Sequence, residues 1–173
     1  MEIPGIAPFS GQPTLTNPLS SENQLDNKQI ISLWLGLLKS TGEIERYLRT
    51  RLHQTFDSTL PQFDLLSALD HAEKPLTKTE LSQQMMVTNG NVTWLVNRMV
   101  REGLISHVHS AKDRRVTLVE LTDKGTSAFQ IMVVEHEKWL HNIFKDLKSD
   151  ELNMLVSLLA RLKKVTRQNT KTK

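Results

Sequence analysis

The fold is decided by the stretch TKTELSQQMMVTNGNVTWLVNRMVREGLISHVHSAKDRRVTLVELT, residues 77–122. Thr77 is a good helix N-cap, and Glu80 three residues later completes a capping box. Thr88 can cap a second helix, which Gly103 ends in the usual C-terminal position for glycine. Two short helices joined by a tight turn are typical of a helix-turn-helix, with the second helix in the recognition position.

A period-two pattern follows the second helix directly. Residues 104–109 and 116–121 alternate between apolar and polar side chains, and a polar, basic turn joins them. This pattern predicts a β-hairpin, the wing of a winged helix-turn-helix lobe. We therefore expect a mainly α fold with a small β-hairpin wing.

The outward face of the second helix carries amide, hydroxyl and guanidinium groups, and no carboxylate interrupts it. Such side chains read base edges and phosphates, and the cations of the wing turn suit the negative minor groove. Trp94 also points outward, where its indole can meet sugars or thymine methyl groups, or lie against the neighbouring helix. The candidate DNA-contacting residues are Lys78, Thr88, Asn89, Asn91, Thr93, Trp94, Asn97, Arg98, Lys112, Arg114 and Arg115.

Charge is distributed unevenly along the chain. The 173 residues contain 22 Lys and Arg against 19 Asp and Glu, yet residues 1–27 hold three acidic residues and no Lys or Arg. Residues 28–173 therefore carry a net charge of +6. A basic body suits a polyanionic partner, although it also serves ordinary solubility.

The remainder of the chain is predicted to be an arm and long helices. Residues 1–27 hold four of the six prolines and few apolar side chains, which indicates an arm. Residues 28–54 and 123–147 show helical spacing, and the helix capped by Ser149 is apolar enough to need a partner helix. The expected organisation is an arm at 1–27, a winged lobe at 58–122, a helical dimerisation region at 28–57 and 123–168, and a tail at 169–173.

Composition and missing motifs exclude several classes of protein. The chain has no cysteine, no apolar run of membrane-spanning length and no secretory signal, so we expect a cytoplasmic protein without a membrane partner. It has no glycine-rich phosphate loop and no metalloprotease motif, so we expect no enzyme and no cofactor. Glu137 with His141, and His107 with His109, each lack a third ligand, so we expect no metal.

Several motifs in this order resemble the MarR family of winged-helix regulators. A closer resemblance is to the hydroxycinnamate-responsive HcaR/CouR-like branch, which shares a similar Trp34–Leu38 block, Thr59–Leu65, Met86–Thr93, and His136 with Trp139. Trp94 departs from the small residue expected at its position, which leaves the base contacts open. The family motifs are Leu60-Pro61-x-Phe63-Asp64-Leu65-Leu66, Glu80-Leu81-Ser82, Val87 to Thr93, Glu102-Gly103-Leu104-Ile105 and Asp113-Arg114-Arg115-x-x-x-Val119-x-Leu121-Thr122.

The resemblance implies a homodimer that binds a pseudo-palindromic operator and is released by a small aromatic effector. The first and last helices would form the dimer, and a cleft beside the winged lobe would take an aromatic acid, possibly hydroxycinnamate, or its coenzyme A thioester. Arg46 is our first choice for the cation that meets the ligand, with Arg49 or His53 behind it; ordinary core packing and a solvated basic face are the alternatives. The candidate ligand-binding residues are Trp34, Leu38, Thr41, Arg46, Arg49, Phe63, Met132 and His136.

The predicted function is thus a ligand-responsive, DNA-binding repressor of aromatic-acid catabolic genes. Two alternatives remain: a helical dimeric module that recruits another protein, and an activator of the same family with a different effector.

Overall fold

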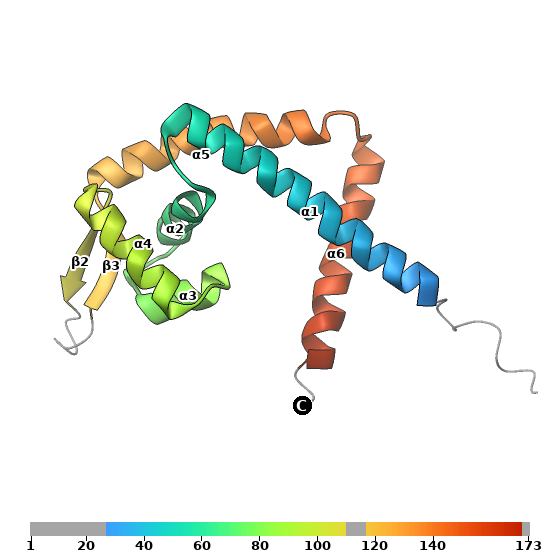
Figure 1. The fold of residues 1–173 in the computed structure, drawn as a ribbon, viewed down its shortest axis with the longest axis horizontal. Helices are drawn as coiled ribbons and strands as arrows, with labels where there is room; N and C mark the ends of the chain where they lie inside the picture. The colour runs from blue at the N-terminus through green and yellow to red at the C-terminus, as the bar shows by residue number, and fades with distance from the viewer. Residues whose placement is uncertain (1–26, 110–116, 171–173) are drawn as a thin grey trace, which may run out of the picture. The chain divides into compact units, whose positions relative to one another are not determined.

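The described part of the chain, residues 27–109 and 117–170 of a computed structural model, is mainly helical with one small antiparallel sheet (Figure 1). This confirms the predicted fold class. The elements are α1 (Asn27–Phe56), α2 (Leu60–Asp70), β1 (Leu76–Thr77), α3 (Lys78–Met85), α4 (Asn89–Arg101), β2 (Ile105–His109), β3 (Thr117–Leu121), α5 (Asp123–Phe144) and α6 (Ser149–Thr170). The predicted arm, apart from Asn27, and the wing turn lie outside the described residues.

Capping boxes fix the starts of α2 and α3. The Thr59 hydroxyl accepts from the backbone N–H of Gln62, and the Gln62 side-chain oxygen accepts from the Thr59 N–H at 2.9 Å. Thr77 and Glu80 repeat this arrangement, with 2.7 Å between the Thr77 nitrogen and the Glu80 carboxylate. Hydrogen bonds from Thr77 to the ionised carboxylate lower the pKa of Glu80. The box predicted at Thr77 is therefore confirmed.

The recognition helix α4 is bounded as its end residues predict. Thr88 is the N-cap, and its hydroxyl accepts from the Asn91 N–H. After the C-cap Glu102, Gly103 adopts a φ of 72°, a left-handed conformation in which side chains are disfavoured. The buried face of α4 consists of Val92, Leu95, Val96 and Met99.

The sheet has the order β1-β3-β2, and both pairings are antiparallel. Ile105 pairs with Leu121 in the hairpin, and Leu76 pairs with Val119 on the other edge of β3. The hairpin was predicted, but β1 was not, because two residues are too short to show a period-two pattern.

The hairpin and α5 meet at a close backbone contact. Thr122 caps α5 and donates its hydroxyl to the Gly103 carbonyl oxygen at 2.7 Å. A Cβ on Gly125 would lie 1.8 Å from the Leu104 carbonyl oxygen, so only glycine fits here. This contact fixes where the hairpin ends and α5 begins.

The hydrophobic core joins residues of α1 from Leu48 onward to α2, α3, α4, the sheet and α5. Leu52, Leu65 and Leu66 are fully buried, and the rings of Phe63 and Phe129 lie 5.4 Å apart. The chain divides within α1 into two compact units, residues 1–40 and 41–173. The core described here belongs to the second unit.

Two segments expose their apolar side chains. Every residue of α6 whose burial is described is exposed, and its large apolar side chains are 37–65% accessible. In the first unit, the large apolar side chains between Ile30 and Leu38, except Leu37, are 43–61% accessible.

Three further points concern the helices. Ser149 was predicted to cap α6 but lies inside it, since the Lys148 N–H donates to the Glu151 carboxylate at 2.8 Å and so takes the capping position. The helix α5 ends at Phe144 rather than at 147. None of the helices in the described ranges is long and apolar enough to cross a membrane.

Candidate nucleic-acid interface

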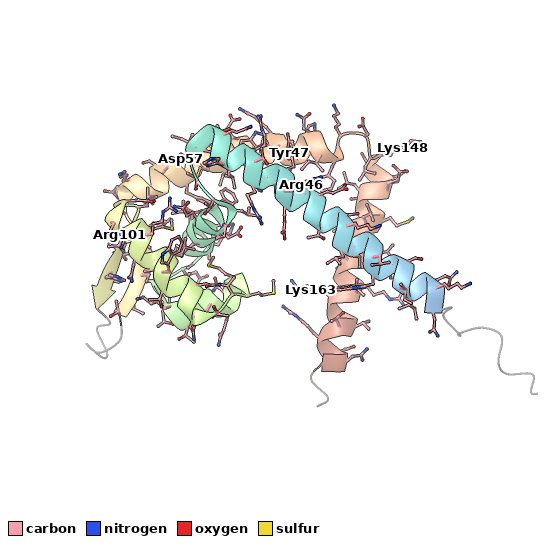
Figure 2. The ribbon with its side chains drawn as sticks, viewed as in Figure 1. Arg46, Tyr47, Asp57, Arg101, Lys148 and Lys163 are labelled. Atoms are coloured by element: carbon pink, nitrogen blue, oxygen red, sulfur yellow. The ribbon has the colours of Figure 1, made fainter. Side chains whose placement is uncertain are left out.

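The outward face of α4 is accessible along its length. Asn91, Asn97 and Arg101 are exposed, and Trp94 is 61% accessible, while the opposite face lies in the core. Arg101 projects from the C-terminal end of α4 in Figure 2. One side of the helix is therefore anchored, and the other presents amide, indole and guanidinium groups together.

The smaller polar candidates act partly within the backbone. The Thr93 hydroxyl donates to the Asn89 carbonyl oxygen at 2.9 Å, and Thr88 caps the helix. Lys78 is the first residue of α3 and is half-buried. Asn89 and Thr88 are exposed at the N-terminus of α4, where free N–H groups and the helix dipole favour a phosphate.

The expectation that no carboxylate interrupts this face is wrong. Glu102 lies one turn after Arg98 and accepts from its Nε at 2.8 Å. The Arg98 guanidinium carbon also lies 5.9 Å from the centre of the Trp94 ring. Arg98 is thus held between a carboxylate and an indole.

Trp94 meets both of the interpretations that its sequence position allowed. Its indole is largely accessible, yet it also borders a hollow of about 260 Å³ between α2, the α3–α4 turn and α4. The hollow is mostly apolar and is lined by Pro61, Met85, Val87, Asn91, Val92, Trp94 and Leu95. The wing candidates Lys112, Arg114 and Arg115 lie outside the described residues.

The predicted ligand-binding residues of α2 and α5 are packed together. The Phe63 ring stacks on the His136 imidazole with centroids 4.5 Å apart, and Met132 is buried one turn before His136. Burial lowers the pKa of His136, an effect that the charge of Glu137 partly offsets. Phe63 and Met132 belong to the hydrophobic core, and the half-buried His136 packs against Phe63.

The predicted residues of α1 are exposed. Arg46 projects from α1 beside Tyr47 (Figure 2), and neither Arg46 nor Arg49 forms an ion pair with another described residue. Thr41 is exposed as well. Trp34 and Leu38 are 61% and 55% accessible in the first unit.

Sequence reasoning missed Arg51. Its guanidinium carbon lies 5.3 Å from the centre of the Trp139 ring, and the Phe56 ring lies 6.1 Å from the same indole. The Nε of Arg51 is buried and has no hydrogen-bond partner among the described residues. Its position three residues after the inward-facing Leu48 is the signal that points to it.

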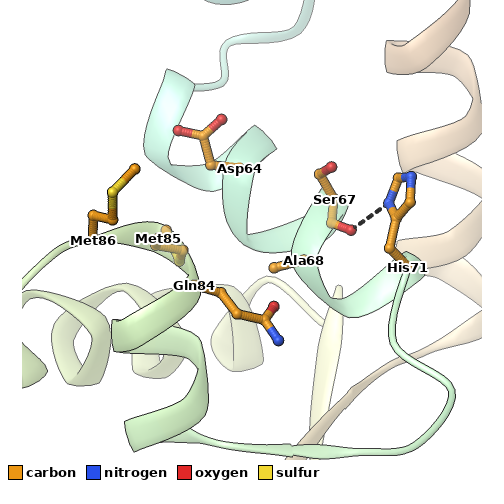
Figure 3. A pocket seen from close by; sticks show the side chains of 7 residues that line it. All are labelled: Asp64, Ser67, Ala68, His71, Gln84, Met85 and Met86. Carbon is orange, nitrogen blue, oxygen red and sulfur yellow. Dashed lines mark hydrogen bonds between the residues drawn. The ribbon is translucent and has the colours of Figure 1, made fainter. Parts of the chain in front are cut away.

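A second hollow, of about 450 Å³, lies between α2 and α3 (Figure 3). It is lined by Asp64, Ser67, Ala68, His71, Gln84, Met85 and Met86. Partial desolvation raises the pKa of Asp64, and the charge of Glu45 raises it further. Because its lining includes a carboxylate and no arginine or lysine, this hollow suits an aromatic acid anion poorly. Among the described residues, no group of three or more His, Asp or Glu is placed to hold a metal.

Comparison with known proteins agrees with this geometry. The MarR family model matches residues 56–116. An "Uncharacterized HTH-type transcriptional regulator" of Bacillus cereus is 28% identical over 133 residues, which are 76% of this chain and 87% of that protein. The "HTH-type transcriptional repressor YetL" of Bacillus subtilis is 29% identical over 98 residues, 57% of each chain.

A solved structure extends the likeness to the fold. A cysteine-to-serine mutant of MarR from E. coli, crystallised with operator DNA, superposes with a TM-score of 0.69 at 26% identity. The superposition covers 78% of this chain and 96% of that one. The matched residues 56–116, the relatives and the fold are thus all similar to the MarR family of transcriptional regulators.

Proposed function

We propose that this chain is a homodimeric repressor that binds a pseudo-palindromic operator and leaves it when an aromatic acid or its coenzyme A thioester binds. The observation that carries the DNA-binding part is the outward face of α4, where Asn91, Trp94, Asn97 and Arg101 are exposed together. A repressor among the relatives, and a structural neighbour that was crystallised with operator DNA, support the same interpretation.

The exposed apolar side chains support the homodimer. Soluble proteins rarely leave large contiguous apolar patches in water, and such patches mark interfaces. Both α6 and residues 27–40 carry such side chains. A second copy related by a two-fold axis would cover them, and it would present two recognition helices to half-sites about 34 Å apart.

The effector proposal rests on the aromatic residues around α5. The Phe56 ring contacts Trp139, and the Phe63 ring stacks on His136. The Arg51 guanidinium lies over Trp139. An aromatic ring can pack among such groups, and a carboxylate or thioester oxygen needs a cation. Arg46 remains our first choice for that cation, and Arg51 is the addition that the structure suggests. Within the second unit, Thr41, Arg49 and Met132 complete the proposed ligand residues, while Trp34 and Leu38 of the first unit remain predictions from the sequence.

Release of DNA requires that the effector prefer a conformation in which the lobes no longer fit the operator. Phe63 and Met132 are packed in the core, so a ring reaches them only if these side chains move. A hundredfold loss of operator affinity needs a coupling free energy of about 2.8 kcal/mol.

The DNA-binding part is tested by selecting duplexes from a random pool with the full chain. The selected duplex and a scrambled duplex of equal composition are then titrated by gel shift at constant salt. A regulator binds the selected duplex at least about a thousandfold more tightly. Equal affinities for the two duplexes would favour the protein-interaction alternative.

The effector part is tested with p-hydroxycinnamate and its coenzyme A thioester. A ligand that binds only the native state raises the melting temperature, and it should also weaken binding to the selected duplex. Arg46→Ala should bind DNA normally but respond less to the ligand. This effector class is overturned if both compounds leave the melting temperature and the affinity for the selected duplex unchanged. An equal response in Arg46→Ala would remove Arg46 from the site.

A further inference from the structure

A chain of hydrogen bonds connects the recognition helix to the start of α2. The Arg98 Nε donates to one oxygen of Glu102 at 2.8 Å, and the Gln62 Nε2 donates to the other oxygen at 3.2 Å. The Gln62 side-chain oxygen accepts from the Thr59 N–H at 2.9 Å and from the Thr59 hydroxyl at 3.0 Å. The Glu102 carboxylate is therefore held from both sides.

The orientation of the Gln62 amide among these hydrogen bonds follows from which groups can donate and which can accept. A backbone N–H only donates, so the group that faces the Thr59 nitrogen must be the amide oxygen. The NH₂ group of the same amide then has to face Glu102. Gln62 is 3% accessible, so burial also restricts its side chain. The carboxylate consequently meets a donor that is fixed in place.

Helix stability does not explain Glu102. A negative side chain at a helix C-terminus lies near the negative end of the helix dipole, where it is unfavourable. An ion pair with the acid C-terminal to the base is also the weaker of the two orientations. The Glu102 carboxylate is placed at the end of α4 despite these costs. Its two contacts, Arg98 and Gln62, indicate what it does there.

Arg98 bonds to the described residues through its Nε. Only its Nε is bonded to Glu102, and no other described residue engages the Nη groups in a hydrogen bond. The guanidinium lies 5.9 Å from the Trp94 ring centre, within the range of a cation–π contact. Arg98, which is half-buried, and Trp94, which is exposed, thus form one unit on the outward face of α4.

We propose that Gln62 and Glu102 are positioning residues that fix Arg98, stacked on Trp94, in the orientation in which it contacts operator DNA, and so set discrimination between operator and other duplexes. This inference rests on the proposed DNA-binding function. We call Gln62 and Glu102, which together hold Arg98, the clamp. The clamp has an electrostatic cost, because a carboxylate beside the interface repels phosphate. In return, Arg98 has a fixed orientation, because the clamp holds its guanidinium in one conformation before DNA binds.

The test exchanges the two members of the clamp. Glu102→Gln removes the charge, Gln62→Glu sets two carboxylates against each other, and the double variant restores an amide–carboxylate hydrogen bond with the roles reversed. Gln62→Glu keeps an acceptor for the Thr59 cap, as Glu80 does for Thr77. Glu135→Gln, which removes the partner of Lys138 on α5, is the matched control. Melting temperatures of all variants report folding.

Each full-length variant is titrated with the selected duplex and with its scrambled counterpart. The clamp predicts that Glu102→Gln and Gln62→Glu each lower the affinity ratio about fivefold or more, the smaller end of one side-chain contact to a base or phosphate. The double variant should recover most of the ratio, and Glu135→Gln should leave it unchanged. Charge alone instead predicts an unchanged ratio for Glu102→Gln, because a lost negative charge tightens binding to both duplexes equally.

Equal tightening on both duplexes, or a double variant no better than Gln62→Glu, overturns the inference while the proposed function stands. Failure of the unmodified protein to select any duplex overturns the proposed function, and the inference with it.

Discussion

The imidazole of His136 stacks on the ring of Phe63, with centroids 4.5 Å apart and planes inclined by 27°. This contact joins α5 to α2 inside the second unit, and burial lowers the pKa of His136 below its usual 6.5. The neutral imidazole is therefore the form that the folded protein prefers.

We expect stability to fall when the pH drops below about 6.5. In that range the unfolded chain binds a proton at this histidine and the folded chain does not, so protonation favours unfolding until the lower folded pKa is reached. His136→Phe keeps a ring against Phe63 and cannot titrate. The free energy of unfolding, measured by urea at pH 5.5 and pH 7.5, should thus depend less on pH in His136→Phe. His141→Gln, an exposed position on the same helix, is the control, and a pH dependence unaltered by His136→Phe refutes the assignment.

Gly125→Ala should destabilise the protein by about 2 kcal/mol or more, as overpacking of a tight contact does. The new methyl group would collide with the Leu104 carbonyl oxygen, which is backbone and cannot turn away. Gly42→Ala, in open space on α1, should instead stabilise by about 0.5–1 kcal/mol. Thermal unfolding at one fixed protein concentration compares them, and similar effects at both positions would contradict the contact.

Leu159→Glu should convert the proposed dimer to a monomer without unfolding the winged lobe. Leu159 is 49% accessible on α6, and a charge placed in an apolar interface has no partner there. Ser157→Glu lies two residues away, on nearly the opposite side of the helix, and should leave the dimer intact. Sedimentation equilibrium measures the mass of each variant. A dimer that persists in Leu159→Glu places the interface elsewhere.

Arg115→Ala should weaken binding to the selected duplex severely while the dimer stays folded. The prediction comes from the basic turn that joins the two hairpin strands, since a cation suits the narrow minor groove. Lys173→Ala, at the C-terminal residue, removes one charge elsewhere and serves as the control. Gel-shift affinity unchanged by Arg115→Ala would remove this side chain from the interface.

Local signals in the sequence predicted most of the lobe. The caps at Thr77 and Thr88 and the left-handed Gly103 act within a few residues, so a sequence pattern contains all that determines them. The strand β1 escaped prediction because two residues carry no periodicity. Its pairing with β3 joins Leu76 to Val119, which lies far along the chain.

The polar contacts of the candidate site could not be predicted in the same way. Gln62 lies 40 residues before Glu102, so the clamp on Arg98 depends on how α2 packs against α4. Arg51 is similar, because its contact with Trp139 joins α1 to α5. The exposed face of α4 was predictable because helical spacing alone separates Asn91 and Asn97 from the buried side chains.

The most direct test of the central claim, that this face of α4 reads DNA, is the affinity ratio between selected and scrambled duplexes in Asn97→Ala. Asn142→Ala, an exposed asparagine on α5, is the matched control. The account predicts a loss of about fivefold or more in the ratio for Asn97→Ala, since an asparagine that bonds a base contributes to discrimination, and no change for Asn142→Ala. An equal ratio in both variants and in the unmodified protein would contradict it.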